Sequence, residues 1–123
     1  MRDYPHFPSY ELRCKCGCDG GQMDDVFMET LVSMRKNAGF SFPITSAYRC
    51  PDYNAQVSGT GRDGPHTTGK AVDIQVSGDL ASEVIELAMI YEFPGLGVSQ
   101  KGKHGSRFIH IDSARAKRWV WSY

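Results

Sequence analysis

The chain has 123 residues, and its 41% hydrophobic and 23% charged residues are ordinary for a globular protein. This composition excludes a disordered chain, and the length suffices for one hydrophobic core. Fourteen basic residues balance fourteen acidic ones, so no strong field draws the protein onto nucleic acid or an anionic membrane. We therefore expect a single domain, residues 1–123, that is monomeric and binds neither nucleic acid nor membrane.

The N-terminal segment, residues 1–21, is rich in proline, glycine and cysteine, and we expect it to be irregular. It lacks the apolar stretch of a signal peptide, so we expect synthesis in the cytoplasm without export by this N-terminus. No apolar run in the chain approaches the roughly 20 residues that a membrane span needs.

The four cysteines are Cys14, Cys16, Cys18 and Cys50. Their spacing is not the C-x-x-C of a zinc knuckle or a redox motif. It favours cysteines that pack as small hydrophobic residues or lie in a loop, in a reduced state. A local structural metal site, or a disulfide to Cys50, is the alternative.

Apolar spacing predicts two helices. One covers residues 22–38, with Asp19 or Gly21 at its start and Gly39 at its end. The second begins with Asp79 as its cap and is ended by Pro94. The side chains expected to be buried are Met23, Val26, Phe27, Leu31, Met34 and Ala38 in the first helix, and Leu80, Val84, Leu87, Ala88 and Tyr91 in the second.

The remaining segments predict short strands and loops. The expected strands cover residues 42–49, 71–76, 95–99, 107–112 and 118–121, with a helical turn over 51–57 and loops over 58–70 and 102–106. Helices and strands do not alternate regularly, so we expect an α+β domain with a small, mostly antiparallel sheet and helices packed on one face. The arginines of residues 115–123 are expected to be solvated beside core tryptophans.

Two of the predicted strands separate apolar from titratable side chains. Alternation places their branched aliphatic residues on one face and Asp73, His110 and Asp112 on the other. His66 lies seven residues before Asp73 and can fold back towards it. Two imidazoles and one carboxylate suit a catalytic zinc site with a position open for water, for which hydrolysis is the natural reaction. The spacing alone leaves open a metal-free, hydrogen-bonded His/Asp pair in a wet core.

Residues 64–73, GPHTTGKAVD, resemble the S-x-H-x-x-G-x-A-x-D signature of the zinc D-alanyl-D-alanine carboxypeptidase family. This family of peptidoglycan metallopeptidases includes phage endolysin peptidases, and the hedgehog signalling domain shares its fold. Residues 44–54, ITSAYRCPDYN, resemble the family's strand, arginine and following turn, and residues 108–112, FIHID, resemble its final metal-ligand strand. The three segments follow the family's order.

The resemblance implies one zinc ion per chain, held by His66, Asp73 and His110 on the sheet face opposite the helices. It implies that Arg49 holds a carbonyl oxygen or carboxylate of the substrate, unless it is an ordinary surface arginine. His104 resembles a histidine that shuttles a proton near the metal, unless it is an exposed loop residue. Asp112 could accept a hydrogen bond from a ligand imidazole and fix its tautomer, or support a neighbouring turn.

Two positions depart from the family pattern. Gly64 replaces the signature serine, which removes a hydroxyl from the loop. Arg107 replaces the glutamate that dipeptidase-type relatives place three residues before the last histidine, which favours a histidine base.

The function that the resemblance implies is zinc-dependent hydrolysis of peptide bonds in the stem peptides of bacterial peptidoglycan. The enzyme would be a carboxypeptidase or an endolysin-type endopeptidase that acts on the cell wall, for instance after phage-mediated release. The alternative is a non-catalytic, zinc-containing binding module of the same fold, which the missing serine at Gly64 favours.

Overall fold

The computed structural model describes all residues 1–123. Its α-helices are α1 (Ser9–Leu12), α2 (Asp25–Ala38), α3 (Pro51–Val57) and α4 (Gly78–Ile90), and its short 3₁₀-helices are η1 (Pro65–Thr68) and η2 (His104–Ser106). The strands are β1 (Ile44–Ser46), β2 (Ala71–Ile74), β3 (Gly95–Ser99), β4 (Phe108–Asp112) and β5 (Trp119–Ser122). None of the helices has the length and apolar character that crossing a membrane requires.

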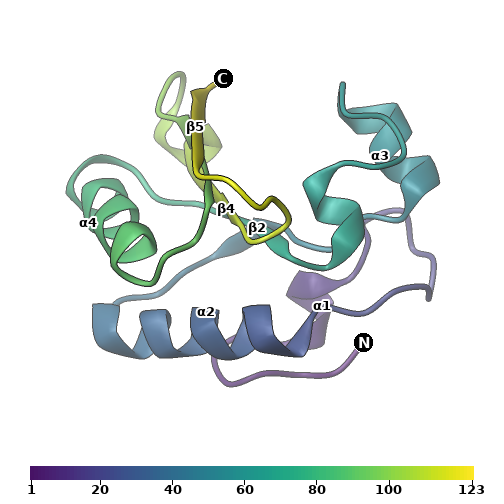
Figure 1. Ribbon diagram of the computed structural model, residues 1–123, viewed down its shortest axis with the longest axis horizontal. Helices are drawn as coiled ribbons and strands as arrows, with labels where there is room; N and C mark the ends of the chain where they lie inside the picture. The colour runs from purple at the N-terminus through teal and green to yellow at the C-terminus, as the bar shows by residue number, and fades with distance from the viewer.

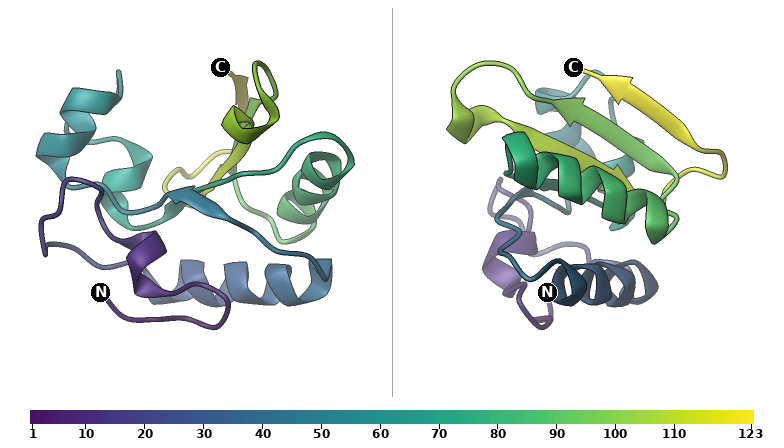
Figure 2. Two further views of the ribbon diagram at one scale, coloured as in Figure 1. Left: turned by 180° about the vertical axis from the view of Figure 1, so that it is seen from behind. Right: turned by 90° about the vertical axis from the view of Figure 1, so that its left-hand side faces the viewer.

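The five strands form one sheet in the order β1-β2-β4-β3-β5. All neighbouring pairs are antiparallel except β3 and β5, which are parallel and are seen side by side in Figure 2. In the register of β2 and β4, Asp73 lies opposite His110 and Ile74 lies opposite Ile109. The expected α+β class with a mostly antiparallel sheet is confirmed, and the central register places polar side chains on one face together.

The hydrophobic core lies between the sheet and the helices α2 and α4 (Figure 1). The aliphatic side chains of the two central strands are fully buried in it, as alternation predicts. Helix α3 and η1 lie on the far side of the central strands from α4 in Figure 1, so the helices do not all share one face. The core residues of β2 and β4 are Val72, Ile74, Ile109 and Ile111.

Helix α2 begins later than the apolar spacing predicts. The Asp24 carboxylate accepts a hydrogen bond from the Phe27 N–H at 2.9 Å and so caps the helix, which therefore begins at Asp25. Gly39 ends the helix in the left-handed conformation, with φ 76°, as expected. The prediction of a buried Val26 is wrong, because this side chain is 70% exposed.

Helix α4, in contrast, begins earlier than predicted, one residue before the expected cap. Ser77 precedes its first residue, Gly78, so Asp79 lies inside the first turn, where its charge is favourable to the helix dipole. Leu80, expected in the core, is 39% exposed, and Ala81 is buried in its place.

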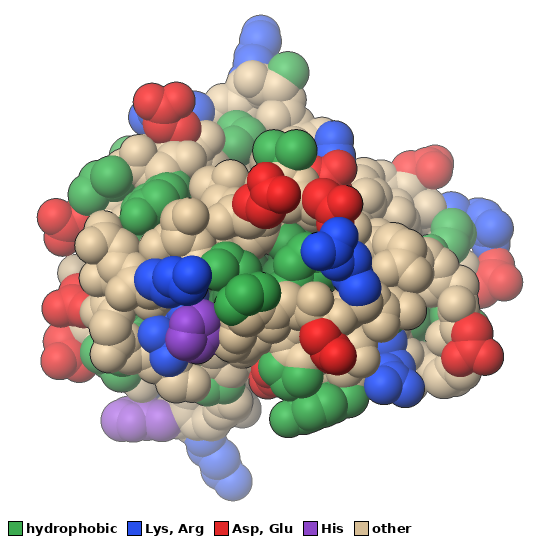
Figure 3. Space-filling model, turned by 90° about the horizontal axis from the view of Figure 1, so that it is seen from below, with side chains coloured by type: hydrophobic (Ala, Val, Ile, Leu, Met, Phe, Trp, Pro, Cys, Tyr) green, Lys and Arg blue, Asp and Glu red, His purple; other side chains and the backbone are tan.

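The N-terminal segment is less irregular than expected. It contains the single-turn helix α1, and Tyr4, Phe7 and Leu12 are buried in the main core. Figure 3 shows the face of the molecule that α2 and this segment form. Acidic and basic side chains are interspersed on it and do not gather into one patch.

Candidate metal centre

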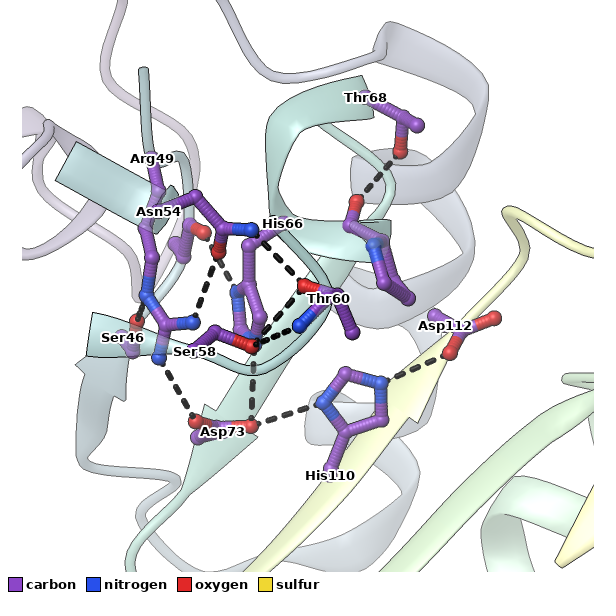
Figure 4. Close-up of polar contacts among 12 residues, drawn as sticks. Ser46, Arg49, Asn54, Ser58, Thr60, His66, Thr68, Asp73, His110 and Asp112 are labelled. Atoms are coloured by element: carbon purple, nitrogen blue, oxygen red, sulfur yellow. Dashed lines mark hydrogen bonds and ion pairs between the residues drawn. The ribbon is translucent and has the colours of Figure 1, made fainter. Parts of the chain in front are cut away.

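Three side chains from different elements converge on one point between the sheet and η1 (Figure 4). His66 comes from η1, Asp73 from β2 and His110 from β4, and all three are buried. The Asp73 Oδ1 atom lies 3.3 Å from His66 Nε2 and 2.9 Å from His110 Nδ1. The structure therefore brings together the three residues that the sequence predicts as metal ligands.

The other ring nitrogen of each histidine has a fixed partner. His66 Nδ1 lies 2.7 Å from the carbonyl oxygen of Ala47, and His110 Nε2 lies 2.7 Å from the Asp112 carboxylate. A carbonyl and an ionised carboxylate can only accept, so these two nitrogens carry the protons. His66 Nε2 and His110 Nδ1 consequently face Asp73, and in neutral rings both would present lone pairs to it.

Charge reinforces this arrangement. Burial by itself raises the pKa of Asp73, but hydrogen bonds from His110 and His66 outweigh it and hold the pKa well below its ordinary value. Burial disfavours the charged form of His110, yet its bonds with Asp112 and Asp73 raise its pKa above the ordinary value. The ionised Asp73 thus creates a strong local demand for positive charge beside the two imidazoles.

This donor set fits a zinc ion. Two imidazole nitrogens and one carboxylate oxygen lie within 4.8 Å of one another, as three ligands of one small cation must. Each imidazole also donates its outer N–H to an acceptor, the support that metal-ligating histidines have in zinc sites. The sequence also left open a metal-free, hydrogen-bonded arrangement of these side chains. Without a metal, a proton would be needed between Asp73 and each of the two ring nitrogens that face it.

Asp112 is fully buried behind His110, and its charge is shared with an arginine. Burial raises the pKa of Asp112, but the hydrogen bonds from His110 and Arg115 lower it further than burial raises it. Both contacts from Arg115, through Nε and Nη2, are 3.3 Å long. Asp112 therefore contacts a predicted ligand imidazole, where the sequence places it, and it also accepts from the Ala114 N–H in the following turn.

The C-terminal tryptophans are not core residues, contrary to expectation. Trp119 is 62% exposed. Trp121 lies over the site, with its ring centroid 5.0 Å from that of His110 and with the Arg115 guanidinium 4.6 Å from the ring. They are placed there because β5 is the edge strand of the sheet, beside β3.

Two glycines of β3 make room for this arrangement. Gly95 lies opposite Asp112 and Gly97 lies opposite His110 in the register of β3 and β4. A Cβ atom at Gly97 would approach the Trp121 ring to 2.7 Å, and one at Gly95 would collide with the Asp112 carboxylate. Side chains at these positions would displace the groups that surround His110.

Arg49 faces the site and is held by several partners. Its Nε atom donates to Ser46 Oγ and its Nη1 atom donates to Asn54 Oδ1, both at 3.1 Å. Its Nη2 atom lies 3.9 Å from Asp73 Oδ2. The side chain is 17% exposed, so it is not the surface arginine of the alternative interpretation.

Asn54 positions Arg49 and was not singled out from the sequence. It is fully buried on α3, and its Nδ2 atom donates to Thr60 Oγ1 at 2.8 Å and to the Gly61 carbonyl at 2.6 Å. The sequence feature that could have identified Asn54 is its position at the end of residues 44–54, the segment that resembles the family's strand, arginine and turn.

The lost serine hydroxyl at Gly64 has a counterpart in the structure. The Thr60 side chain fills the space beside Gly64, where a Cβ atom would collide with it. The Thr60 hydroxyl there accepts the hydrogen bond from Asn54. A hydroxyl is therefore present at this place, supplied by a different residue of the same loop.

His104 is the predicted site residue that the structure does not bring to the centre. It is exposed on η2 and lines a separate hollow, together with Pro43 and Gln75. Gln75 Nε2 donates to the Gly105 carbonyl at 2.9 Å, which holds the η2 loop at that place. The alternative interpretation of an exposed loop histidine describes His104 in this structure.

A cleft of about 440 Å³ opens over the centre. Tyr123, which the sequence interpretation missed, lines it and packs against Phe108, with ring centroids 5.0 Å apart. Burial and the nearby Asp73 carboxylate raise the pKa of Tyr123, so its phenol is protonated at neutral pH. The other titratable side chains that line the cleft are Arg49, His66, Asp73 and Arg115.

Comparison with known proteins identifies relatives of the chain. The sequence model of the family described as peptidase M15 matches residues 5–112. The peptidoglycan L,D-endopeptidase MepK of Escherichia coli (strain K12) is 28% identical in an alignment of 118 residues that covers 92% of this chain and 60% of that protein. The proteins of the same name from Escherichia coli O157:H7 and Shigella flexneri show the same values. The chain thus spans about three fifths of the length of these relatives.

Proposed function

Because the chain belongs to the peptidase M15 family, we propose that it is a zinc-dependent peptidase that hydrolyses peptide bonds in the stem peptides of bacterial peptidoglycan. One observation carries the proposal. His66 Nε2 and His110 Nδ1 both face the ionised Asp73, while their outer nitrogens are tied to Ala47 and Asp112. The relatives named as peptidoglycan endopeptidases support the choice of substrate.

We assign the binding of one zinc ion to His66, Asp73 and His110. When bound, zinc supplies Lewis-acid polarisation of the scissile carbonyl and activation of water for attack. Asp112 holds the proton of His110 on Nε2 and keeps Nδ1 directed at Asp73. The Ala47 carbonyl does the same for His66 through Nδ1.

Arg49 and Tyr123 are the residues that we assign to the substrate. The guanidinium of Arg49 is fixed by Ser46 and Asn54 at the wall of the cleft, where it can stabilise negative charge that develops on the carbonyl oxygen. The protonated phenol of Tyr123 is a second hydrogen-bond donor in the cleft lining. Arg49 is held in place by its partners before substrate binds, which reduces the cost of reorganisation.

A second function, a zinc-containing binding module without turnover, is favoured by one observation. The cleft lining includes no glutamate, and its only histidine is the proposed ligand His66. His104 would have to move with its loop to act as the base there. Both functions predict bound zinc and affinity for wall peptides, but only the peptidase predicts turnover.

We infer endopeptidase action rather than carboxypeptidase action, because the relatives are named as endopeptidases. Of the two arginines of the cleft, Arg115 is paired with Asp112, and Arg49 is the one that we assign to the scissile carbonyl. A carboxypeptidase needs a further cation that is free to bind the substrate's terminal carboxylate. Carboxypeptidase action is the alternative that the next experiment distinguishes, and phage-mediated release stays a prediction.

The test is digestion of two synthetic stem peptides by the zinc-loaded protein, followed by mass spectrometry. One peptide carries a free C-terminal carboxylate, and the other carries the same sequence with an amidated C-terminus. Endopeptidase action cleaves both at an internal bond. Release of only the terminal residue, and only from the free carboxylate, would show a carboxypeptidase, and binding of zinc without cleavage of either peptide or of whole peptidoglycan would show the binding module.

A further inference from the structure

A second group of metal-ligating side chains lies outside the cleft. Cys14, Cys16 and Cys18 from the N-terminal segment meet Cys50, which directly follows Arg49 in the chain. We call these residues the four-cysteine cluster. Their Sγ atoms all lie within 4.8 Å of one another although Cys18 and Cys50 are separated by more than thirty residues.

The sulfur separations match a metal site and not a disulfide. The Sγ atom of Cys16 lies 3.4 Å from that of Cys14 and 3.6 Å from that of Cys50. A disulfide requires about 2.05 Å between its sulfur atoms. Four thiolates around one zinc ion, each at about 2.3 Å, are separated by about 3.8 Å along each edge of the tetrahedron. All four cysteines are unpaired in the structure.

The backbone around the cluster is shaped to direct the sulfur atoms inward. Gly17 has φ 86°, which lets the chain turn between Cys16 and Cys18. The Cys50 N–H donates to the Sγ atom of Cys14 at 3.3 Å, and the Tyr53 N–H donates to the Sγ atom of Cys50 at 3.4 Å. Amide donors to sulfur stabilise thiolates, the form in which cysteine binds metal.

We propose that the four-cysteine cluster binds a second zinc ion, with four thiolate ligands and a structural role. A site with four protein ligands leaves no position open for water, so this zinc would not take part in hydrolysis. The C-x-x-C spacing of zinc knuckles is absent from the sequence, but the turn at Gly17 and the arrival of Cys50 supply the same convergence.

The cluster is connected to the cleft through residues 47–50. The Ala47 carbonyl accepts from His66, and the Arg49 N–H donates to the His66 carbonyl at 3.1 Å. Tyr48, which lies between these two residues, donates its N–H to the Leu12 carbonyl at 3.0 Å. Zinc in the cluster would thus fix the segment that orients His66 and carries Arg49, which is a positioning effect on the catalytic site.

The test is the zinc content of the full-length protein, purified under reducing conditions with zinc and measured by mass spectrometry of the metal. We expect two zinc ions per chain in the wild type and one in the variant His66→Ala/His110→Ala. The variant His104→Ala is the matched control and retains two. Because the double variant lacks the proposed catalytic site, a zinc ion that remains in it supports the cluster whether or not the protein is a peptidase.

Cobalt substitution identifies the ligands. Co²⁺ bound by thiolates shows sulfur-to-metal charge-transfer absorption in the near ultraviolet, which histidine and carboxylate ligands do not give. We expect this absorption in the wild type and in His66→Ala/His110→Ala, and a weaker absorption in Cys16→Ser, which keeps three thiolates and whose altered side chain is exposed. Absence of the absorption in the wild type, with all four thiols open to a thiol reagent or paired as disulfides, would overturn the proposal without any variant having to fold.

Discussion

Asp112 holds the proton of His110 on Nε2, at a distance of 2.7 Å, and thereby directs the opposite ring nitrogen at Asp73. Asp112 is itself fully buried and compensated by Arg115. One strand, β4, therefore carries both a predicted metal ligand and the group that sets its tautomer, two residues apart on the same face. We therefore expect zinc binding at this site to depend on Asp112 as well as on the three proposed ligands.

The first prediction concerns this pair. The change Asp112→Asn replaces an acceptor with an amide that cannot attract the His110 proton equally well, so His110 loses basicity and a fixed orientation. We expect zinc affinity to fall roughly 10–100-fold, the range for loss of such outer partners. Competition with a chromophoric chelator measures this affinity. Asp63→Asn, at an exposed position, is the control, and an equal affinity of both variants would contradict the role of Asp112.

The second prediction separates substrate stabilisation from metal binding. In Arg49→Lys the fork that joins Ser46 and Asn54 is replaced by a single ammonium group. We expect kcat on a stem peptide to fall about 100-fold or more, as for removal of an oxyanion donor, while zinc content stays unchanged. The control Arg62→Lys changes an exposed arginine that is paired with Asp52. Unchanged turnover in Arg49→Lys would show that Arg49 has only a structural role.

The third prediction tests the replacement of the signature serine. Gly64→Ser places a side chain against Thr60, so we expect it to destabilise the protein by about 1–3 kcal/mol, as overpacking does. Thr60→Gly alone removes one of the two acceptors of the Asn54 Nδ2 group, and the double change restores a hydroxyl there. Urea unfolding of the four proteins measures the coupling. Gly59→Ser, where a Cβ meets nothing within 4 Å, is the matched control.

Purely additive effects of Thr60→Gly and Gly64→Ser would contradict the interpretation that the two side chains compete for one place. Destabilisation by Gly59→Ser as large as that by Gly64→Ser would contradict it as well, because it would point to loss of glycine in this loop rather than to a collision.

The fourth prediction is a pH dependence with two opposite signs. The pKa of His110 is raised in the metal-free protein, so its contribution to stability is fully present below the ordinary pKa of about 6.5 and is lost as pH rises through the folded value. Zinc binding requires the Nδ1 proton to leave, so zinc affinity rises over the same range. The increase in Tm that zinc causes should therefore grow with pH.

Thermal unfolding with and without zinc from about pH 5.5 to about pH 8 checks this expectation. The series begins below the ordinary histidine pKa of about 6.5 and extends further above it, because the pKa of His110 is raised in the folded protein. His104→Ala controls for an exposed histidine and should keep the same trend. A zinc-induced shift in Tm that is independent of pH would contradict proton competition at His110.

Much of the ligand set could be predicted from the sequence, because it depends on strand alternation. Branched aliphatic residues on β2 and β4 require the core face, which forces Asp73 and His110 onto the other face in one register. His66 lies seven residues before Asp73, so its position already allowed it to fold back towards them. The family resemblance strengthened its assignment as a ligand and added Arg49 as a cation facing the site. Their convergence in the structure agrees with both lines of reasoning.

The missed features depend on tertiary packing, which local patterns do not contain. The position of Trp121 and Tyr123 follows from the parallel pairing of β5 with β3, a long-range contact. The convergence of Cys50 with the N-terminal cysteines, which the sequence left open as an alternative, also depends on a long-range contact, the hydrogen bond from the Tyr48 N–H to the Leu12 carbonyl. His104 was expected near the metal because it resembles a histidine of the family, but the contact from Gln75 to Gly105 holds its loop elsewhere.

The most direct measurement is digestion of purified peptidoglycan by the zinc-loaded protein with and without a chelator, with zinc content determined on the same sample. Zinc held by His66, Asp73 and His110 in a hydrolytic site predicts defined peptide fragments. These fragments should disappear with the chelator, return when zinc is added back, and be absent for His66→Ala/His110→Ala. Stable zinc binding without fragments from several wall types, or fragments that persist in the double variant, would contradict zinc-dependent hydrolysis at this centre.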